Sequence, residues 1–281
     1  MEPWKREEQV VKNTVSPITV KSLIKDFQTI GLKKGDIVIV HSSMSKIGWI
    51  AGGPETIVDA LMEVITPEGT IAMPSMTTGN TDPQCWNYPP VPQEWWEIIR
   101  KESTPYRPEI TPTRGMGRIP EIFRQYKGVL RSNHPIASFA AWGKYARKIT
   151  EEHDLVEEFG MKTPLGKLYD LDAKILLLGV GYENNTSLHL SESLADLQNH
   201  PIMPQGAAIH ENGKRVWLTW TAKVSDSDDF HDLGLAYEAS INYKPGRIGQ
   251  AESRLVSMSD AVDFGIKWLR ANRNYSEKNN E

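Results

Sequence analysis

Two short apolar runs with an amphipathic helix between them constrain the fold more than any other feature of the sequence. Residues 36–40 read Asp-Ile-Val-Ile-Val and residues 69–73 read Gly-Thr-Ile-Ala-Met, which is typical of strands covered on both faces. Between them, Pro54 stands at the first position of a helix predicted over 56–65. A strand-helix-strand order with so short a return predicts a parallel pair of strands in an α/β sheet.

The same signals extend this alternation along most of the chain. Apolar spacing, N-cap residues and glycine stops predict helices over 18–30, 120–126, 143–152, 187–197 and 260–272, and strands over 137–142 and 175–178. From Gly206 two alternating runs are joined by Glu211-Asn212-Gly213, the strongest short-range signal for a hairpin. The predicted fold is α/β: a layered α/β/α domain with a mixed, mainly parallel central sheet and a C-terminal hairpin extension.

Residues 74–118 interrupt the alternation. The segment is rich in proline and tryptophan, and only 94–101 is predicted to be helical. A loop of this length inside a compact domain is usually functional, so we expect it to line or cover a site. The sequence therefore predicts one domain over 16–272 with this insertion, a polar N-terminal segment over 1–15 and a polar tail over 273–281, disordered from residue 274.

Composition narrows the classes of function. The net charge of −4 among 281 residues gives no reason to expect a nucleic-acid partner. No apolar run has the length of a membrane span, and the first residues contain no apolar leader, so a soluble, cytoplasmic protein is expected. The single cysteine, Cys85, excludes an internal disulfide framework and reads as a packing residue rather than a nucleophile. The oligomeric state stays open.

The stretch from Lys174 to Glu192 is the first candidate for chemistry. A buried strand ends at Gly179 and Gly181, and a helix capped by one of residues 184–187 follows it. With Thr186 as the cap, His189 stands at the third helical position, and Glu192 lies three residues further on the same face. The helix dipole disfavours imidazolium and the carboxylate could fix the tautomer, as a general base requires. The alternative is a histidine that only caps or packs, with Glu192 solvated.

The loop over 41–54 is the second candidate, because it follows a strand and opens a helix at the edge where α/β sheets bind ligands. Its serine hydroxyls and backbone amides could cradle a phosphate. The spacing matches neither the Walker A loop nor Gly-x-Gly-x-x-Gly, and a serine/glycine turn without a ligand is the alternative. In the segment 110–118, Arg114 or Arg118 could also meet an anion, or both could be solvated.

The remaining histidines give weaker signals. Pro135 holds His134 in extended backbone at the start of a strand, where it could form a wall of the site or make a structural hydrogen bond. The other histidines have no spacing that predicts a metal cluster, and His-x-x-Glu at 189–192 is too little for zinc or a di-iron centre. No metal is therefore expected.

Taken together, these segments resemble the antibiotic N-acetyltransferase family, which contains the aminoglycoside 3-N-acetyltransferases. The resemblance covers roughly residues 16–270. It rests on His-Ser-Ser-Met-Ser at 41–45, Ile-Gly-Trp-Ile-Ala-Gly-Gly at 47–53, Gly-Thr-Ile-Ala-Met-Pro at 69–74, Asp-Pro at 82–83, Trp86, Pro-Pro-Val-Pro at 89–92, Arg-Ser-Asn-His-Pro at 131–135, Thr-Pro-Leu-Gly-Lys-Leu at 163–168 and, most specifically, Gly-Val-Gly-Tyr-Glu-Asn-Asn-Thr-Ser-Leu-His at 179–189.

The resemblance implies transfer of an acetyl group from acetyl-coenzyme A to an amine of an aminoglycoside-like small molecule, with His189 as the base and Glu192 beside it. The residues expected to bind the coenzyme are His41, Ser42, Ser43, Ser45, Ile47, Gly48, Gly52, Gly53, Thr113 and Arg114. Those expected to meet the acceptor are His134, Asp82, Asp226 and Asp228, with Asp229 as a further choice. Which acid after the hairpin assists the histidine stays open.

Two other hypotheses about the function remain. One is a protein of the same fold that binds coenzyme A with another turnover or none. The other is a Ser/His hydrolase that uses Ser187, Ser191 or Ser43 with His189, but the sequence has no Gly-x-Ser-x-Gly elbow.

Overall fold

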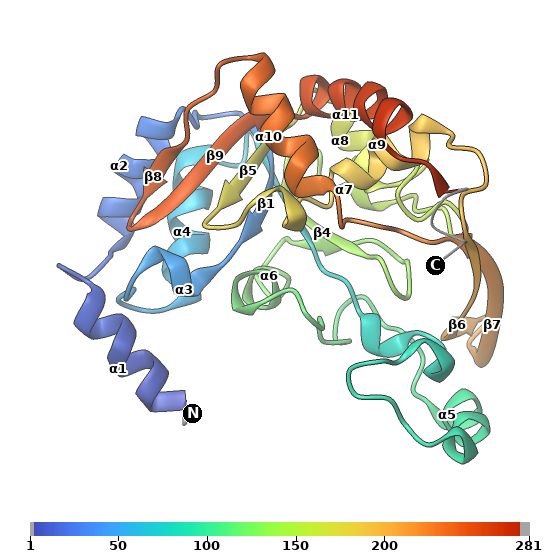
Figure 1. The fold of residues 1–281 in the computed structure, drawn as a ribbon. Helices are drawn as coiled ribbons and strands as arrows, with labels where there is room; N and C mark the ends of the chain where they lie inside the picture. Colours follow the sequence, from blue (N-terminus) through green and yellow to red (C-terminus); the bar gives the residue numbers. More distant parts are fainter. Residues whose placement is uncertain (1–2, 276–281) are drawn as a thin grey trace.

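A seven-stranded sheet runs through the molecule, whose computed structural model describes residues 3–275 (Figure 1). The strand order is β3-β4-β2-β1-β5-β9-β8, with bounds β1 Ile37–Ser42, β2 Thr70–Pro74, β3 Leu130–Arg131, β4 Phe139–Gly143, β5 Lys174–Leu178, β8 Gly246–Ile248 and β9 Ala251–Ser257. Strand β1 pairs in parallel with β2 and β5, and the outer strands pair antiparallel. The predicted parallel pair is confirmed, and it lies at the centre of a mixed sheet.

Helices cover both faces of this sheet because alternate strand residues point to opposite sides. Val38 and Val40 of β1 belong to one buried cluster, and Ile39 belongs to the other. The helices that contribute to the first cluster are α2 Val20–Ile30, α4 Pro54–Ile65 and α6 Arg118–Phe123. Those of the second are α7 Ala146–Thr150, α8 Pro164–Asp170, α9 Leu188–Ala195, α10 Phe230–Ser240 and α11 Met258–Asn272. The layered α/β/α prediction is confirmed.

The N-terminal residues form a helix that the sequence did not predict. Helix α1, Pro3–Asn13, extends from the body of the molecule (Figure 1). The indole Nε1 of Trp49 donates to Glu7 Oε1 over 3.2 Å, and the Trp49 backbone N donates to Thr14 Oγ1 over 2.8 Å. The polar N-terminal residues therefore lie against the loop after β1.

The predicted hairpin is present and forms a sheet of its own. Strands β6, Ile202–Glu211, and β7, Lys214–Lys223, pair antiparallel along their whole length. Asn212 and Gly213 both have positive φ, at 50° and 75°, as a type I′ turn requires. The extension is thus a separate two-stranded sheet and not an added edge of the central one.

The insertion over 74–118 packs against this hairpin and forms hydrogen bonds with it. It contains short 3₁₀ turns η1 Thr78–Asn80, η2 Pro83–Cys85 and η3 Gln93–Trp95, followed by helix α5, Trp96–Glu102. The Tyr106 backbone N donates to Ala208 O over 2.9 Å, and Arg215 Nε donates to Ser103 O over 2.8 Å. Figure 1 shows α5 and the hairpin together, beyond the edge of the central sheet.

Candidate active site

A groove of about 1760 Å³ opens at the carboxyl ends of β1 and β5. Its walls are the loop over 42–55, which includes the short helix α3, Met44–Ile47, the segment 115–119, which leads into the first residues of α6, and the turn 179–184 with η4, Tyr182–Asn184. Helix α1 contributes Trp4, Glu7 and Val10 to the rim. This is the edge at which open α/β sheets bind their ligands.

Several features of the groove suit an anionic, phosphate-bearing ligand. Gly52 and Gly53, with φ of 87° and 70°, lead into the N-terminus of α4, and Gly117, with φ of 84°, leads into α6. Positive φ favours glycine, and helix N-termini present free backbone amides. The Ser42 Oγ is buried without a hydrogen-bond partner in the described chain. The basic side chains on the walls are Lys46, Arg118 and Arg254.

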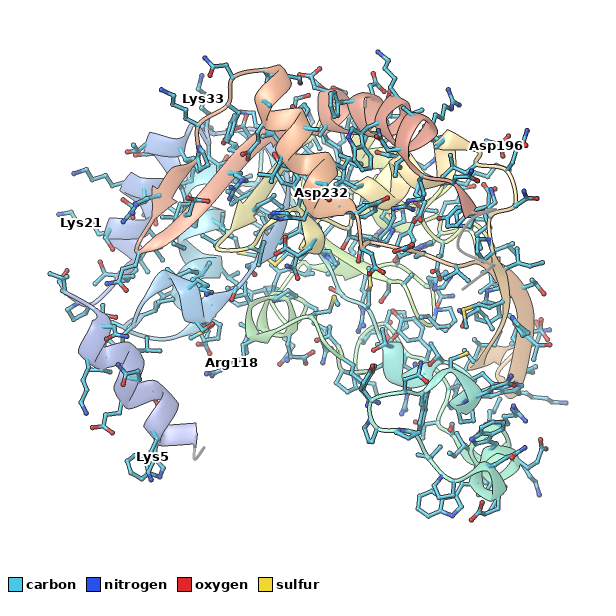
Figure 2. All side chains as sticks on the ribbon, in the orientation of Figure 1. Lys5, Lys21, Lys33, Arg118, Asp196 and Asp232 are labelled. Atoms are coloured by element: carbon cyan, nitrogen blue, oxygen red, sulfur yellow. The ribbon has the colours of Figure 1, made fainter. Side chains whose placement is uncertain are left out.

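The residues predicted to bind the coenzyme divide into two groups. Those that line the groove are Ser42, Ser43, Ser45, Gly48, Gly52 and Gly53. Those that do not are His41, Ile47, Thr113 and Arg114. Arg118, the alternative to Arg114, does line it and is exposed at the start of α6 (Figure 2).

The four residues outside the groove have structural surroundings. Ile47, the last residue of α3, is fully buried in the core. Thr113 binds Glu121 Oε2 through its backbone N and its hydroxyl, and the Arg114 guanidinium lies 6.0 Å from the centre of the Trp86 ring. His41 is buried, and burial, with the charge of nearby His189, lowers its pKa to about 3.

His189 and Glu192 form a hydrogen-bonded pair on α9. Helix α9 begins one residue later than predicted, with Ser187 at the N-cap, so His189 stands at the second helical position. The His189 Nδ1 lies 2.8 Å from Glu192 Oε2. Burial favours the neutral acid, but the hydrogen bond and charge of His189, together with Arg273, lower the pKa of Glu192 below its usual range. An ionised carboxylate accepts, so the Nδ1 donates and Nε2 is left with a lone pair.

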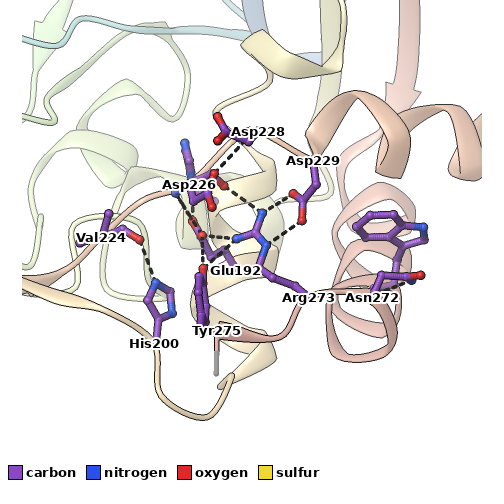
Figure 3. Close-up of polar contacts among 11 residues, drawn as sticks. Glu192, His200, Val224, Asp226, Asp228, Asp229, Asn272, Arg273 and Tyr275 are labelled. Carbon is purple, nitrogen blue, oxygen red and sulfur yellow. Dashed lines mark hydrogen bonds and ion pairs between the residues drawn. The ribbon is translucent and has the colours of Figure 1, made fainter. Parts of the chain in front are cut away.

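Behind this pair, residues that follow α11 hold the carboxylate (Figure 3). Arg273 Nη1 and the hydroxyl of Tyr275, the latter over 3.1 Å, donate to Glu192 Oε1. The same guanidinium binds both oxygens of Asp229, with Nε to Oδ2 at 2.8 Å. The predicted polar tail is therefore wrong at its start, because Arg273 and Tyr275 are buried. Its remaining residues, 276–281, lie outside the described part of the chain.

His189 opens onto a second, smaller cavity of about 190 Å³. Phe159 stacks on the imidazole with a centroid separation of 4.9 Å, and Phe230 lies at 4.9 Å, tilted. The cavity is bounded by the segment 156–159, by α9 and by the hairpin and its flanks, with His200, Ile202, Thr221 and Lys223 on that wall. The hairpin therefore forms one wall of the cavity at His189.

The residues predicted to meet the acceptor do not line this cavity. Asp82 binds Arg100 through two hydrogen bonds of 2.9 Å and borders a different cavity, between the insertion and the hairpin. The Asp226 backbone N donates to Glu192 Oε1 over 3.1 Å, and its Oδ1 accepts from the Asp228 backbone N over 2.9 Å. Asp228 is exposed. Asp229 joins the His189 network through its carboxylate and Arg273, and Asp226 joins it through its backbone, which also accepts from Arg273 Nη2 over 2.9 Å.

His134 makes structural hydrogen bonds. Its Nδ1 accepts from the backbone N of Ala137 over 2.8 Å and of Ile136 over 3.1 Å, so the ring proton sits on Nε2. Burial lowers its pKa to about 4. Its Nε2 lies 3.9 Å from Glu158 Oε2, and Glu158 does line the cavity at His189. Neither Glu158 nor Arg273 stands in a motif, so nothing in the sequence predicts that they lie near His189.

Between residues 3 and 275, no group of three or more His, Cys, Asp or Glu side chains is arranged to hold a metal ion. In the same range, no helix combines the length and the apolar character that crossing a membrane requires.

Residues 39–270 match the family of aminoglycoside 3-N-acetyltransferases. The chain is 45% identical to the SPbeta prophage-derived aminoglycoside N(3′)-acetyltransferase-like protein YokD of Bacillus subtilis over 262 residues, 93% of this chain and 96% of that protein. It is 33% identical to aminoglycoside N(3)-acetyltransferase VII of Streptomyces paromomycinus, over 92% of this chain and 94% of that protein.

Solved structures give the same result. The crystal structure of YokD from B. subtilis superposes with a TM-score of 0.91 at 44% identity, covering 95% of this chain and 99% of that one. AAC-IIIb in a binary complex with CoASH gives 0.81 at 30% identity, covering 91% and 97%. AAC-VIa bound to sisomicin gives 0.83 at 30% identity, covering 91% and 98%.

Proposed function

The chain belongs to the aminoglycoside 3-N-acetyltransferase family, and from this premise we propose that it transfers the acetyl group of acetyl-coenzyme A to an amino group of an aminoglycoside-like small molecule, with His189 as the general base. The observation that carries the proposal is the 2.8 Å contact of His189 Nδ1 with ionised Glu192, at a cavity that His189 lines. Relatives with solved structures bind CoASH and sisomicin.

The larger groove is the proposed coenzyme site. Its positive-φ glycines, its two helix N-termini and the unpartnered Ser42 hydroxyl fit a phosphate-bearing ligand. A Cβ at Gly52 would come 2.6 Å from Thr56 Oγ1, so this turn has no room for a side chain. The bound thioester would supply the acetyl group: the C–N bond forms, the C–S bond breaks, and coenzyme A leaves as its thiol after taking up the proton that the amine loses. The protein would orient the thioester toward the amine.

His189 would take the proton that the amine loses as it is acetylated. Glu192 accepts from Nδ1, which fixes the tautomer and leaves Nε2 as the acceptor of that proton. The charge of Glu192 then stabilises the imidazolium that forms. Arg273, Tyr275 and the Asp226 backbone amide satisfy the other carboxylate oxygen, so Glu192 stays ionised although it is buried.

The first test is His189→Gln, compared with His210→Gln, an exposed hairpin histidine outside both cavities. We expect His189→Gln to lower kcat by about 10²- to 10⁴-fold, the usual contribution of a positioned general base. Calorimetry should show unchanged coenzyme A affinity in both variants.

A folded His189→Gln protein with more than half of the wild-type kcat would exclude His189 as the base. Wild-type protein that binds coenzyme A but acetylates no amine of an aminoglycoside panel would favour the alternative of a binding protein.

A further inference from the structure

A buried carboxylate without a cationic partner lies in the same cavity as His189. Glu158 and His189 both line the 190 Å³ space. The side chain of Glu158 is 15% exposed, and its Oε2 has no hydrogen-bond partner among the described residues. Buried carboxylates are normally paired, so an unpaired one at a ligand cavity calls for a partner from outside the protein.

The two neighbouring histidines do not provide that partner. The Nε2 of His134 is 3.9 Å from Glu158 Oε2, but its proton points to Leu155 O at 3.3 Å and the ring is neutral. The Nε2 of His153 donates to the backbone O of Glu158 over 2.9 Å, and its Nδ1 accepts from Ser132 Oγ over 2.9 Å, which makes this ring neutral too. Within the described chain, no lysine or arginine forms an ion pair with Glu158.

We propose that Glu158 binds an ammonium group of the acceptor, separate from the amine that His189 deprotonates. Glu158 would therefore be a specificity-determining residue for the second amino group of the acceptor. The inference rests on the proposed function and names a further binding residue of the same site. The cavity is smaller than the range of about 300–1,000 Å³ of pockets that enclose drug-sized ligands, so it would hold one amine-bearing ring or chain of a larger molecule.

The pH dependence of binding follows from the groups that face this carboxylate. Across the cavity these are His189 and Glu192 on α9, His200 before β6, and Lys223 at the end of β7. Glu157 stands next to Glu158 in the chain, and His134 and His153 lie behind it. Burial raises the pKa of Glu158 to about 7, whereas burial holds the pKa of His134 near 4 and of His153 near 3. Glu158 thus gains its charge between pH 6 and 8, where these two histidines are already neutral. Affinity for a cation should rise over that interval.

The test is a calorimetric titration of the full chain, loaded with coenzyme A, with sisomicin and with α,ω-diamines of three to six carbons. At pH 8 we expect Glu158→Gln to weaken the binding of the tightest probe at least tenfold, because one partner of a buried charge pair is removed. The matched control is Glu157→Gln, the exposed neighbour on the rim, for which the change should stay below twofold. Between pH 6 and 8, wild-type affinity should rise and that of Glu158→Gln should not.

Three results would overturn the inference: equal affinity in wild type and Glu158→Gln, equal losses in the two variants, or no binding of any probe by the wild type. Acetylation of sisomicin with unchanged affinity in Glu158→Gln would leave the proposed function standing and remove this site. Binding that depends on Glu158, without acetylation of any probe, would leave the Glu158 site standing and remove the proposed transferase function. A thermal melt of each variant shows that the loss comes from the site and not from unfolding.

Discussion

Arg273 is the residue whose contacts say most about how the base is held. It joins two carboxylates, Glu192 and Asp229, and lies 5.6 Å from the centre of the Phe230 ring. Burial by itself lowers the pKa of Arg273. The hydrogen bonds to Asp229 and the charge of Glu192 raise it by more than that, so the guanidinium stays charged. It acts on the reaction through Glu192 and is a positioning residue.

We predict that Arg273→Met lowers kcat and moves the acid limb of kcat/KM to higher pH. Without the guanidinium the pKa of Glu192 rises, so the carboxylate is protonated, and His189 loses its partner, at a higher pH than in wild type. The stability that ionised Glu192 contributes is present above its unfolded pKa and is lost as pH falls through its folded pKa. Breaking such a buried pair costs about 3–5 kcal/mol.

The measurement is a kcat/KM profile between pH 5 and 9, with Arg273→Lys as the conservative variant. Lysine keeps the charge but not the forked geometry, so its profile should lie between the other two. If the acid limb of a folded Arg273→Met protein is not shifted, the ion pair between Arg273 and Glu192 has a structural role only.

At the scale of an element, the turn into α4 carries the clearest prediction. Gly52 has a φ of 87°, and an added Cβ would meet Thr56 Oγ1 at 2.6 Å. We expect Gly52→Val to weaken coenzyme A binding at least tenfold in calorimetry, since the turn faces the proposed phosphate site. Gly213→Val is the control, because it has a φ of 75° in the hairpin turn, with open space around it.

Both substitutions carry a backbone strain of about 1–3 kcal/mol, which thermal melts would reveal. Only Gly52→Val should lose coenzyme affinity. Matching losses of affinity in the two variants would mean that strain, and not the groove, explains the effect.

Local patterns made much of the element structure predictable. The parallel pair β1 and β2 and the Asn212-Gly213 hairpin follow from short stretches of sequence whose periodicity or turn chemistry is strong. Strands β3 and β8 span two and three residues, too few to show a period, and β9 reads Ala-Glu-Ser-Arg-Leu-Val-Ser. Helices α1, α3, α8 and α10 were not predicted either.

The candidate site divides in the same way. The pair His189 and Glu192 is local, four residues of one helix, and the sequence indicated it. Arg273 reaches Glu192 across 81 positions of the chain, and Glu158 meets His189 only through the folded cavity. Such contacts depend on tertiary packing, which a single sequence does not show. The sequence predicted Asp82, Asp226 and Asp228 as the acids at the acceptor, and none of them lines the cavity at His189.

At the scale of the whole molecule, the two cavities are built from different parts of the chain. The hairpin lines the cavity at His189 and not the groove, and the Val224 backbone N donates to Pro201 O over 2.9 Å at its base. We predict that replacing residues 202–223 by a short glycine linker leaves coenzyme A affinity within threefold of wild type and abolishes measurable acceptor binding. Calorimetry with coenzyme A and with sisomicin measures both. Loss of coenzyme binding in a folded variant would show that the two sites are coupled.

The hairpin's separate hydrogen-bond ladder has a consequence for how such proteins diverge. Mutations in β6 and β7 would reshape the wall of the proposed acceptor cavity without breaking a hydrogen bond of the central sheet. If the two proposed sites are correct, natural selection can change which amines are accepted while the coenzyme site is inherited unchanged.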